Sequence, residues 1–318
     1  MIISASRRTD IPALYSDWLL NRLREGSVLV PHPRNVGRYS HVLLNPEVVD
    51  CIVFWTKNHG PMLNKLDIIE KMGYPFYFQY TLTPYDGQIE RNLPPKPELV
   101  DIFKRLSQRL GSNRVVWRYD PVITSSSLDV QYHLDSFEKM ASMLEGSTHR
   151  CIFSFVDLYP RVRPSLMPIT DQELSESDMH LIAEGFSRIA RKHQMSLSTC
   201  SEPIDLSLYG ITHASCIDKK LIEEIIGCPI KVKKDAGQRP GCGCVESIDI
   251  GSYGCCSHSC IYCYGGFGLK TAQKNIAQHD PASPLLIGQP DEAAIIITSP
   301  VTEIRDFERV PESIDTSY

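Results

Sequence analysis

The stretch VVWRYDPVITSSSLDVQYHLDSFEKMASMLEGSTHRCIFSF, residues 115–155, decides the fold class of this chain. It opens with a β-branched and aromatic run at residues 115–118 and closes with a second such run at 151–155. Between them, residues 130–144 carry apolar side chains at the spacing of an amphipathic helix. A strand, a helix and a strand in this order predict a βαβ unit, which places two parallel strands in one sheet.

The same alternation extends along most of the chain. Further strands are expected at residues 2–4, 51–55, 76–81 and 196–200, with a shorter extra strand at 28–30 and a last one at 293–298. Helices are expected at residues 11–24, 96–109, 171–193 and 269–278. Six or seven βα units predict an α/β fold, as a complete or partial TIM-type (β/α) barrel. A doubly wound sheet is the alternative that the pattern separates poorly from a barrel.

The texture of the sequence changes after Gly227. Residues 231–268 read KVKKDAGQRPGCGCVESIDIGSYGCCSHSCIYCYGGFG, which is rich in glycine, cysteine and turn residues and poor in hydrophobic periodicity. We therefore expect three parts, which are an α/β barrel body at 1–227, a cysteine-rich cluster-binding segment at 228–290 that folds onto the barrel mouth, and a C-terminal strand and tail at 291–318.

Composition and charge exclude several classes of protein. The net charge of -5 gives no general attraction for nucleic acid, so nucleic acid is not a favoured partner. No stretch approaches the roughly 18 consecutive apolar residues of a membrane span, and the N-terminus lacks the apolar region of a secretory signal. The sequence contains no Gly-x-Ser-x-Gly elbow, P-loop or His-Glu-x-x-His motif. We expect a cytoplasmic protein without a membrane partner.

The chain has eleven cysteines, and their distribution is uneven. Cys51 and Cys151 lie in the first half, whereas the other nine fall between Cys200 and Cys263. A reducing cytoplasm and an odd count both argue against a disulfide framework. The local enrichment therefore predicts metal ligation.

Cys256, Cys260 and Cys263 form a C-x3-C-x2-C motif, with Tyr262 directly before the third cysteine and Gly265 shortly after it. Three thiolates on one tight loop can bind three irons of a [4Fe-4S] cluster and leave the fourth iron open to a small molecule. Thiolate softness and this spacing favour an iron-sulfur cluster, with a zinc knuckle or free thiols as the alternatives.

This aromatic-flanked loop resembles the cluster loop of the radical SAM superfamily. A longer set of segments resembles an uncharacterised bacterial family known as domain of unknown function 1848, over most of residues 1–290. These segments run from SASRRTDIPA through VFWTKN, WRYDP and QRPGCGC to SYGCCSHSCIYCY. The superfamily resemblance implies a [4Fe-4S] cluster that binds S-adenosylmethionine and reduces it to methionine and a hydrogen-abstracting 5'-deoxyadenosyl radical. It also implies an electron donor such as a flavodoxin or a ferredoxin.

The position of the motif departs from the superfamily pattern. The superfamily loop usually follows the first barrel strand, whereas this loop lies near the C-terminus. We therefore expect it to reach the barrel mouth by folding back. No Gly-Gly-Glu-like segment, which in the superfamily helps to hold the methionine amino group, can be placed on a strand after the loop.

A second set of cysteines comprises Cys200, Cys216, Cys242 and Cys244. Four thiolates could hold a second [4Fe-4S] cluster or a structural Zn²⁺ ion, since both accept four sulfur ligands. The alternative is that Cys200 and Cys216 are small buried side chains, which is the common role of a free cysteine.

Polar side chains follow the expected strands, and the carboxyl ends of barrel strands meet at one mouth. Arg8 or Arg118 could clamp a carboxylate or phosphate, and Lys57 could pair with an anionic substrate group. Asp120 or Glu202 could hold ribose hydroxyls. A structural ion pair is the alternative for Arg118 and Asp120.

Three further residues, Gln79, Tyr262 and Gly265, are candidates for cofactor binding. The arginines near the mouth favour a small anionic metabolite over a macromolecule as substrate. Three classes of function remain: a radical-SAM-like enzyme, an iron-sulfur electron-transfer or redox-sensing protein that does not use S-adenosylmethionine, and a zinc-stabilised barrel. The first class accounts for both the cysteine loop and the polar mouth.

Overall fold

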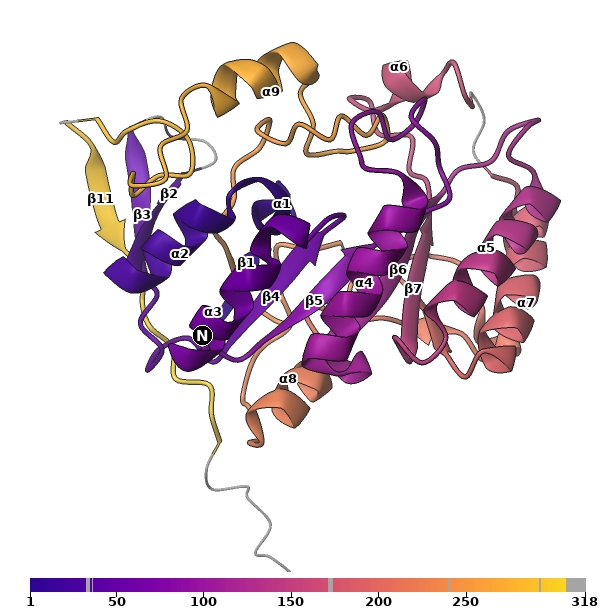
Figure 1. The fold of residues 1–318 in the computed structure, drawn as a ribbon, viewed down its shortest axis with the longest axis horizontal. Coiled ribbons are helices and arrows are strands. Elements are labelled where there is room, and N and C mark those ends of the chain that lie inside the picture. Colours follow the sequence, from indigo (N-terminus) through magenta and orange to yellow (C-terminus); the bar gives the residue numbers. More distant parts are fainter. Residues whose placement is uncertain (33–34, 36, 171–173, 240, 292, 307–318) are drawn as a thin grey trace, which may run out of the picture.

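The computed structural model describes residues 1–306 apart from 33–34, 36, 171–173, 240 and 292. Its main element is an eight-stranded parallel sheet with helices on one face (Figure 1). The strands, in sheet order, are β10 (Ile248–Asp249), β1 (Ile2–Ala5), β4 (Cys51–Thr56), β5 (Phe76–Thr81), β6 (Val115–Val122), β7 (Arg150–Phe155), β8 (Ser196–Thr199) and β9 (Thr212–His213). The expected α/β fold with a parallel sheet is confirmed.

The order of the strands runs in one direction. From β1 to β9 each strand lies beside the next one of this sheet along the chain, and β10 alone joins out of order, beside β1. Within the described residues, no strand pairing joins β9 to β10, so these two strands form the two edges of the sheet. A parallel sheet is therefore established, and its closure into a barrel stays a prediction.

Both faces of the sheet are buried, which explains why its strands read as nearly continuous apolar runs. On the helix-covered face, the Trp117 ring stacks on Phe137 at 4.9 Å, and Phe137 stacks on Phe186 at 4.0 Å between ring centroids. On the other face, Tyr77 and its neighbours pack against α8 (Lys219–Ile226) and against buried side chains on either side of it, including Cys216, Cys242 and Val245. The Tyr77 hydroxyl donates to the Cys216 carbonyl at 2.7 Å.

Five helices cover the first face, namely α2 (Ser16–Glu25), α3 (Leu66–Lys71), α4 (Lys96–Leu110), α5 (Val130–Leu144) and α7 (Glu176–Lys192) (Figure 1). The helices expected at 96–109 and 130–144 are confirmed. The helix expected from residue 171 begins at Glu176, because the Ser175 side chain caps it by accepting the Asp178 N–H at 3.1 Å. Residues 171–173 of that prediction lie outside the described part.

The helix expected at residues 11–24 is divided in two. The structure has a short α1 (Ile11–Leu14) and then α2, with Tyr15 between them at a non-helical φ of -136°. The buried Tyr15 hydroxyl donates to the carbonyl of Cys255, more than two hundred residues further along the chain. A tertiary contact therefore accompanies the break, and a single amphipathic pattern does not reveal it.

A second, three-stranded sheet lies beside the first. In it, β3 (Arg38–Leu43) pairs antiparallel with β2 (Ser27–Pro31) and parallel with β11 (Ile295–Thr298). The strands expected at 28–30 and 293–298 are thus present, but they belong to this separate sheet and not to the main one. Residues 292 and 307–318 of the expected C-terminal part lie outside the described residues.

The remaining helices are α6 (Arg163–Leu166), α8 (Lys219–Ile226) and α9 (Leu269–Ile276), with 3-10 turns at Gly60–Lys65, Ser112–Arg114 and Ser207–Tyr209. Figure 1 shows α9 and the loops around it above the carboxyl ends of β4 and β5, and α8 near the opposite end. None of the helices in the described ranges has the length and apolar character needed to cross a bilayer.

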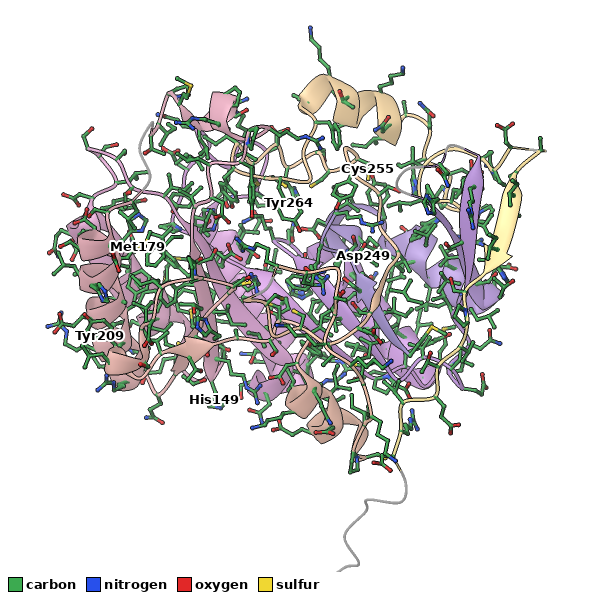
Figure 2. All side chains as sticks on the ribbon, turned by 180° about the vertical axis from the view of Figure 1, so that it is seen from behind. His149, Met179, Tyr209, Asp249, Cys255 and Tyr264 are labelled. Carbon is green, nitrogen blue, oxygen red and sulfur yellow. The ribbon has the colours of Figure 1, made fainter. Side chains whose placement is uncertain are left out.

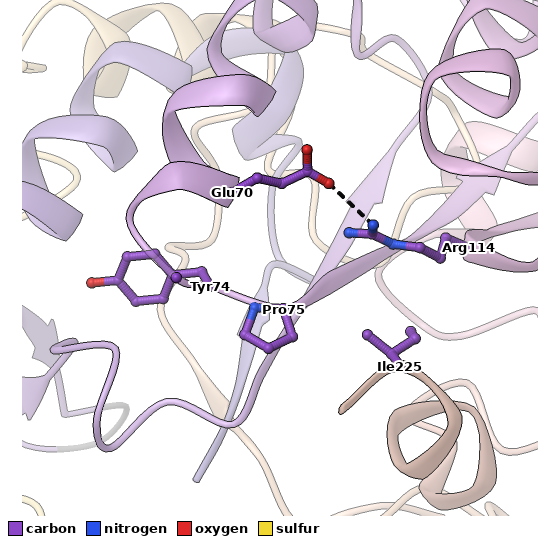
Figure 3. Close-up of a pocket in the computed structure, with 6 residues that line it drawn as sticks. Glu70, Tyr74, Pro75, Arg114 and Ile225 are labelled. Atoms are coloured by element: carbon purple, nitrogen blue, oxygen red, sulfur yellow. Dashed lines mark hydrogen bonds and ion pairs between the residues drawn. The ribbon is translucent and has the colours of Figure 1, made fainter. Parts of the chain in front are cut away.

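A pocket of about 320 Å³ opens at the amino ends of β5 and β6 (Figure 3). Glu70, Tyr74, Pro75, Arg114 and Ile225 line it, and the Glu70 carboxylate pairs with the Arg114 guanidinium at 3.1 Å. In parallel α/β sheets the chemistry lies at the carboxyl ends of the strands. This pocket therefore lies at the end of the sheet opposite the one where a functional site is expected.

A buried histidine makes the fold acid-sensitive. His59 is 0% exposed and packs against the rings of Phe78 and Tyr80. Burial lowers the pKa of His59 to about 3, whereas in an unfolded chain a histidine titrates near pH 6.5. As the pH falls through this window, the unfolded state binds a proton that the folded state does not, so stability decreases.

Between pH 7.5 and pH 5, we expect the free energy of unfolding of His59→Phe to fall by about 2 kcal/mol less than that of the wild-type chain. Urea unfolding at the two pH values measures this difference. His149→Gln, at an exposed site, is the control and should behave like wild type. Parallel losses in His59→Phe and wild type would show that His59 does not govern the acid sensitivity.

Candidate functional site

The loop that carries Cys256, Cys260 and Cys263 folds back over the carboxyl ends of β1, β4 and β5. The Ile261 N–H donates to the Ile89 carbonyl at 3.0 Å, and Cys260 pairs with Glu90 in an isolated antiparallel bridge. Residues 89 and 90 belong to the loop after β5. Figure 2 shows Cys255 and Tyr264 in the upper half of the molecule, and His149, which precedes β7, near the lower side. The motif thus lies at the carboxyl ends of these strands.

The strand β10 anchors the start of this loop to the first strand. Asp249 accepts hydrogen bonds from the hydroxyls of Ser4 at 3.0 Å and Ser6 at 2.7 Å, and from the Arg7 N–H at 2.9 Å. Segment 228–290 therefore contributes a strand to the main sheet as well as covering its edge.

Gly251 packs closely against the side chain of Ser6. A Cβ at Gly251 would lie 2.0 Å from the Ser6 hydroxyl oxygen and 2.5 Å from the Ser6 Cβ, and the bond to Asp249 holds Ser6 in place. We expect Gly251→Ala to lower the free energy of unfolding by about 1–3 kcal/mol, the usual cost of overpacking. Gly87→Ala is the control, because nothing lies within 4 Å of that position, and urea unfolding compares the two. Equal stability of the two variants would contradict the packing described.

The sulfurs of the loop have backbone donors. The N–H groups of Gly265 and Gly266 donate to the Cys263 sulfur, and that of His258 donates to the Cys256 sulfur. Burial raises the pKa of all three thiols, and these N–H groups lower it for Cys256 and Cys263. Donors of this kind stabilise a thiolate and are a regular feature of cluster ligands.

The geometry of the side chains bears on the kind of metal. In the described part of the chain, no three His, Cys, Asp or Glu side chains already surround one ion position. A cubane does not require such convergence, because each thiolate binds a different iron. The donor set on the loop therefore fits a cluster by its chemistry, with three soft ligands and N–H groups directed at two of them.

A buried charge cluster lies directly beneath the loop. The Glu90 carboxylate pairs with Lys57 Nζ at 2.7 Å and with Lys96, and it accepts the hydroxyls of Thr83 at 2.7 Å and Tyr262. Burial alone would raise the pKa of Glu90, but the two ammonium groups lower it to about 2. Lys57 is thus already paired within the protein, and its ammonium group lies 5.3 Å from the centre of the Tyr262 ring.

Three other predicted residues, Arg118, Asp120 and Glu202, lie near the carboxyl ends of β6 and β8, on the side of the sheet opposite the main helix layer. The guanidinium of Arg118 pairs with Asp120, and Asp120 also accepts the Ser154 hydroxyl. Burial would raise the pKa of Asp120, but Arg118 holds it below its usual range. Glu202 accepts the Phe155 N–H at 3.0 Å, and burial raises the pKa of Glu202 to about 7. The charge of Asp120 contributes to raising the pKa of Lys57 and the pKa of Glu202.

Arg8 and Gly265 meet at the rim of the site. The Arg8 side chain donates to the Gly251 carbonyl at 3.1 Å and lies 5.2 Å from the centre of the Tyr253 ring. A Cβ at Gly265 would come within 2.9 Å of the Arg8 carbonyl oxygen, so glycine allows the loop to approach this backbone. Both residues hold the loop in place through contacts within the protein.

The second cysteine set is assembled from three segments of the chain. The sulfurs of Cys200 and Cys216 lie 3.4 Å apart, Cys216 also contacts Cys244, and Cys244 contacts Cys242. Gln79, expected to bind cofactor, donates to the Cys216 carbonyl at 2.8 Å and so belongs to this set and not to the loop.

Two further residues, Asp10 and Glu90, belong to the site, and of these only Glu90 was missed by sequence reasoning. Asp10 accepts from Thr56 at 2.8 Å, from the Lys57 N–H at 2.7 Å and contacts His258 at 2.9 Å, so it ties the loop to β4. Its position just after the first strand was a usable signal. Glu90 has no such signal, because it lies in a polar loop without periodicity.

Comparison with solved structures gives matches that include one weak likeness. A crystal structure of a candidate α-L-fucosidase from Bacteroides thetaiotaomicron is 13% identical, with 64% of this chain and 96% of that chain covered at a TM-score of 0.26. A score this low carries no argument about fold or function. No curated protein matches the sequence.

Comparison with family models gives a clear result. The model described as domain of unknown function 1848 matches residues 2–265, which includes the main sheet, both cysteine sets and all three cysteines of the loop. The segments in which the sequence resembled this family lie within that match or at its edge. The chain belongs to the domain of unknown function 1848 family.

Proposed function

We propose that this protein is a radical-SAM-like enzyme that holds a [4Fe-4S] cluster on Cys256, Cys260 and Cys263. One observation carries the proposal: the three-cysteine loop folds back over the carboxyl ends of the parallel strands, directly above a buried cluster of charged side chains. A loop used only to store electrons would not need this position over a polar mouth.

The residues of the chain would have distinct tasks. Glu90, with Lys57 and Tyr262, fixes the loop against β4 and β5 through buried ionic hydrogen bonds. Asp120 and Glu202 present carboxylate oxygens at the strand ends, where hydroxyl groups of a bound molecule would find acceptors. When bound, the cluster would supply the electron that splits S-adenosylmethionine into methionine and a 5'-deoxyadenosyl radical.

We also infer that the main sheet is a complete or partial TIM-type barrel. The unbroken order from β1 to β9 favours this arrangement, because doubly wound sheets reverse their strand order. The 228–290 segment, through β10, would then serve as the cluster-binding part at the barrel mouth.

The substrate we propose is a small molecule rather than a macromolecule. The polar groups of the mouth lie on the inner face of the sheet, which suits a ligand that enters it. Electrons would come from a flavodoxin or a ferredoxin, and the reducing cytoplasm would be the location. The rim offers partly exposed rings to such a donor at Tyr253, Tyr264 and Phe267.

Electron paramagnetic resonance tests the proposal. The full chain is purified anaerobically, reconstituted with iron and sulfide, reduced, and measured with and without S-adenosylmethionine. We expect a [4Fe-4S] signal whose shape changes when S-adenosylmethionine is added, because the fourth iron has no protein ligand.

The other results have defined meanings. A cluster signal that ignores S-adenosylmethionine would reject the enzyme in favour of an electron-transfer or redox-sensing protein. Zinc at the loop, with no iron after reconstitution, would reject both and favour a zinc-stabilised barrel.

A further inference from the structure

Four cysteine side chains lie together on the face of the sheet opposite the main helix layer, away from the loop cysteines. Cys200 follows β8, Cys216 follows β9, and Cys242 and Cys244 form a C-x-C turn in the segment that crosses this face. Their sulfurs touch in the order Cys200, Cys216, Cys244, Cys242. We propose that these four thiolates bind one Zn²⁺ ion, a site separate from the iron-sulfur loop.

The spacing of the sulfurs favours a single ion over a second cubane. At a Zn–S distance of about 2.3 Å, two sulfurs of a tetrahedral site lie about 3.8 Å apart. The sulfurs of Cys200 and Cys216 lie 3.4 Å apart, close to that value. Thiolates of a cubane bind different irons and are held further from one another. The close approach of Cys200 to Cys216 therefore suits one small tetrahedral ion.

The groups around the sulfurs suit thiolates. Arg118 donates from Nη1 to the Cys216 sulfur at 2.7 Å and also attracts Cys200. The Ile217 N–H donates to the Cys244 sulfur at 3.3 Å, and the Cys244 N–H donates to the Cys242 sulfur. Zinc with four thiolates carries a charge of about -2, and a buried guanidinium with N–H donors offsets part of it.

The sulfurs run in a row and do not yet enclose an ion. No three metal-binding side chains of the described residues surround one point, and this applies to these four as well. Cys200 and Cys242 stand at the two ends of the row, so closing the site requires these two side chains to turn inward. Metal binding and local folding are coupled in sites of this kind.

The surrounding segment has little regular secondary structure. Between α8 and β10, the described residues form isolated bridges, at Ile230 with Arg305 and at Lys234 with Val245, in place of helices or strands. A zinc ion would tie this segment to the end of β8 and hold Arg118 beside Asp120. Its role would be structural.

Metal analysis of the full chain tests the site. The protein is produced with zinc and iron both present, and zinc per chain is measured by mass spectrometry. We expect about one zinc per chain, most of it lost in Cys242→Ser/Cys244→Ser and retained in Cys228→Ser. Cys228 is the matched control, because it is buried in the same segment and its sulfur donates to the Pro229 carbonyl at 3.3 Å.

A second measurement does not depend on whether the double variant folds. Cobalt is added to zinc-free protein carrying Cys256→Ser, Cys260→Ser and Cys263→Ser, which removes the loop ligands. We expect the intense visible bands of a tetrahedral cobalt tetrathiolate. This result is independent of the proposed enzyme, since it is obtained without the loop cysteines.

Three outcomes would overturn the zinc site. The first is a chain without zinc whose cobalt form lacks tetrathiolate bands. The second is iron in place of zinc at these four cysteines, and the third is a Cys200–Cys216 disulfide in protein purified under reducing conditions.

Discussion

Replacing Cys256, Cys260 and Cys263 together by serine should reduce the iron content of the reconstituted protein from about four per chain to near zero. Serine hydroxyls stay protonated and are hard ligands, so they do not substitute for thiolates on iron. The fold should survive, because the strands of the main sheet precede the three cysteines and bury their own core. Iron analysis, the visible spectrum and circular dichroism measure these effects.

The neighbouring cysteine provides the matched control for this experiment. The Cys255 sulfur donates to the Ser252 carbonyl at 3.1 Å and is fully buried beside Tyr15, so it faces away from ligation. Cys255→Ser should keep its iron. Iron that persists in the triple variant, or that disappears in Cys255→Ser, would place the cluster on other ligands.

Glu90→Gln should lower the free energy of unfolding by about 3–5 kcal/mol, the usual cost of removing one partner from a buried ion pair. The carboxylate is 3% exposed and lies between the ammonium groups of Lys57 and Lys96. The neutral amide keeps the shape but leaves both charges without their counterion in a site of low dielectric constant. Urea unfolding at pH 7 measures the loss.

Glu98→Gln is the control for the loss of a negative charge. Glu98 is exposed in the first turn of α4, close to the Glu90 cluster in sequence, and its replacement should change stability by about 0.5 kcal/mol or less. If Glu90→Gln were as stable as Glu98→Gln, the lysines would be solvated and the loop would have another anchor.

The secondary structure of the main sheet could be read from the sequence because its signals are local. The runs at 76–81 and 151–155 are rich in aromatic and apolar residues, and both faces of these strands are buried, so the pattern is strong. The two-residue strands β9 and β10 were missed, because two residues carry no periodicity. The strand at residues 28–30 was found, but only tertiary pairing assigns it to the second sheet.

The candidate site likewise has one part that the sequence predicts and another that only folding assembles. The C-x3-C-x2-C spacing lies within eight residues, so the covalent chain itself brings the three thiols near each other, and the sequence sufficed to predict a cluster loop. The second cysteine set spans Cys200 to Cys244, and its members were grouped by composition alone. Contacts among its sulfurs appear only in the folded chain.

Local sequence signals accounted for the α/β fold class, the positions of most long elements and the C-x3-C-x2-C spacing of the loop, since each depends on residues close together in the chain. The tertiary structure alone decided that the loop lies over β1, β4 and β5, and that Lys57 is paired with Glu90 and Arg118 with Asp120. These contacts join residues that are distant in sequence or lie in loops, and they depend on charge and packing in the folded state. A single sequence carries no periodic signal for such contacts.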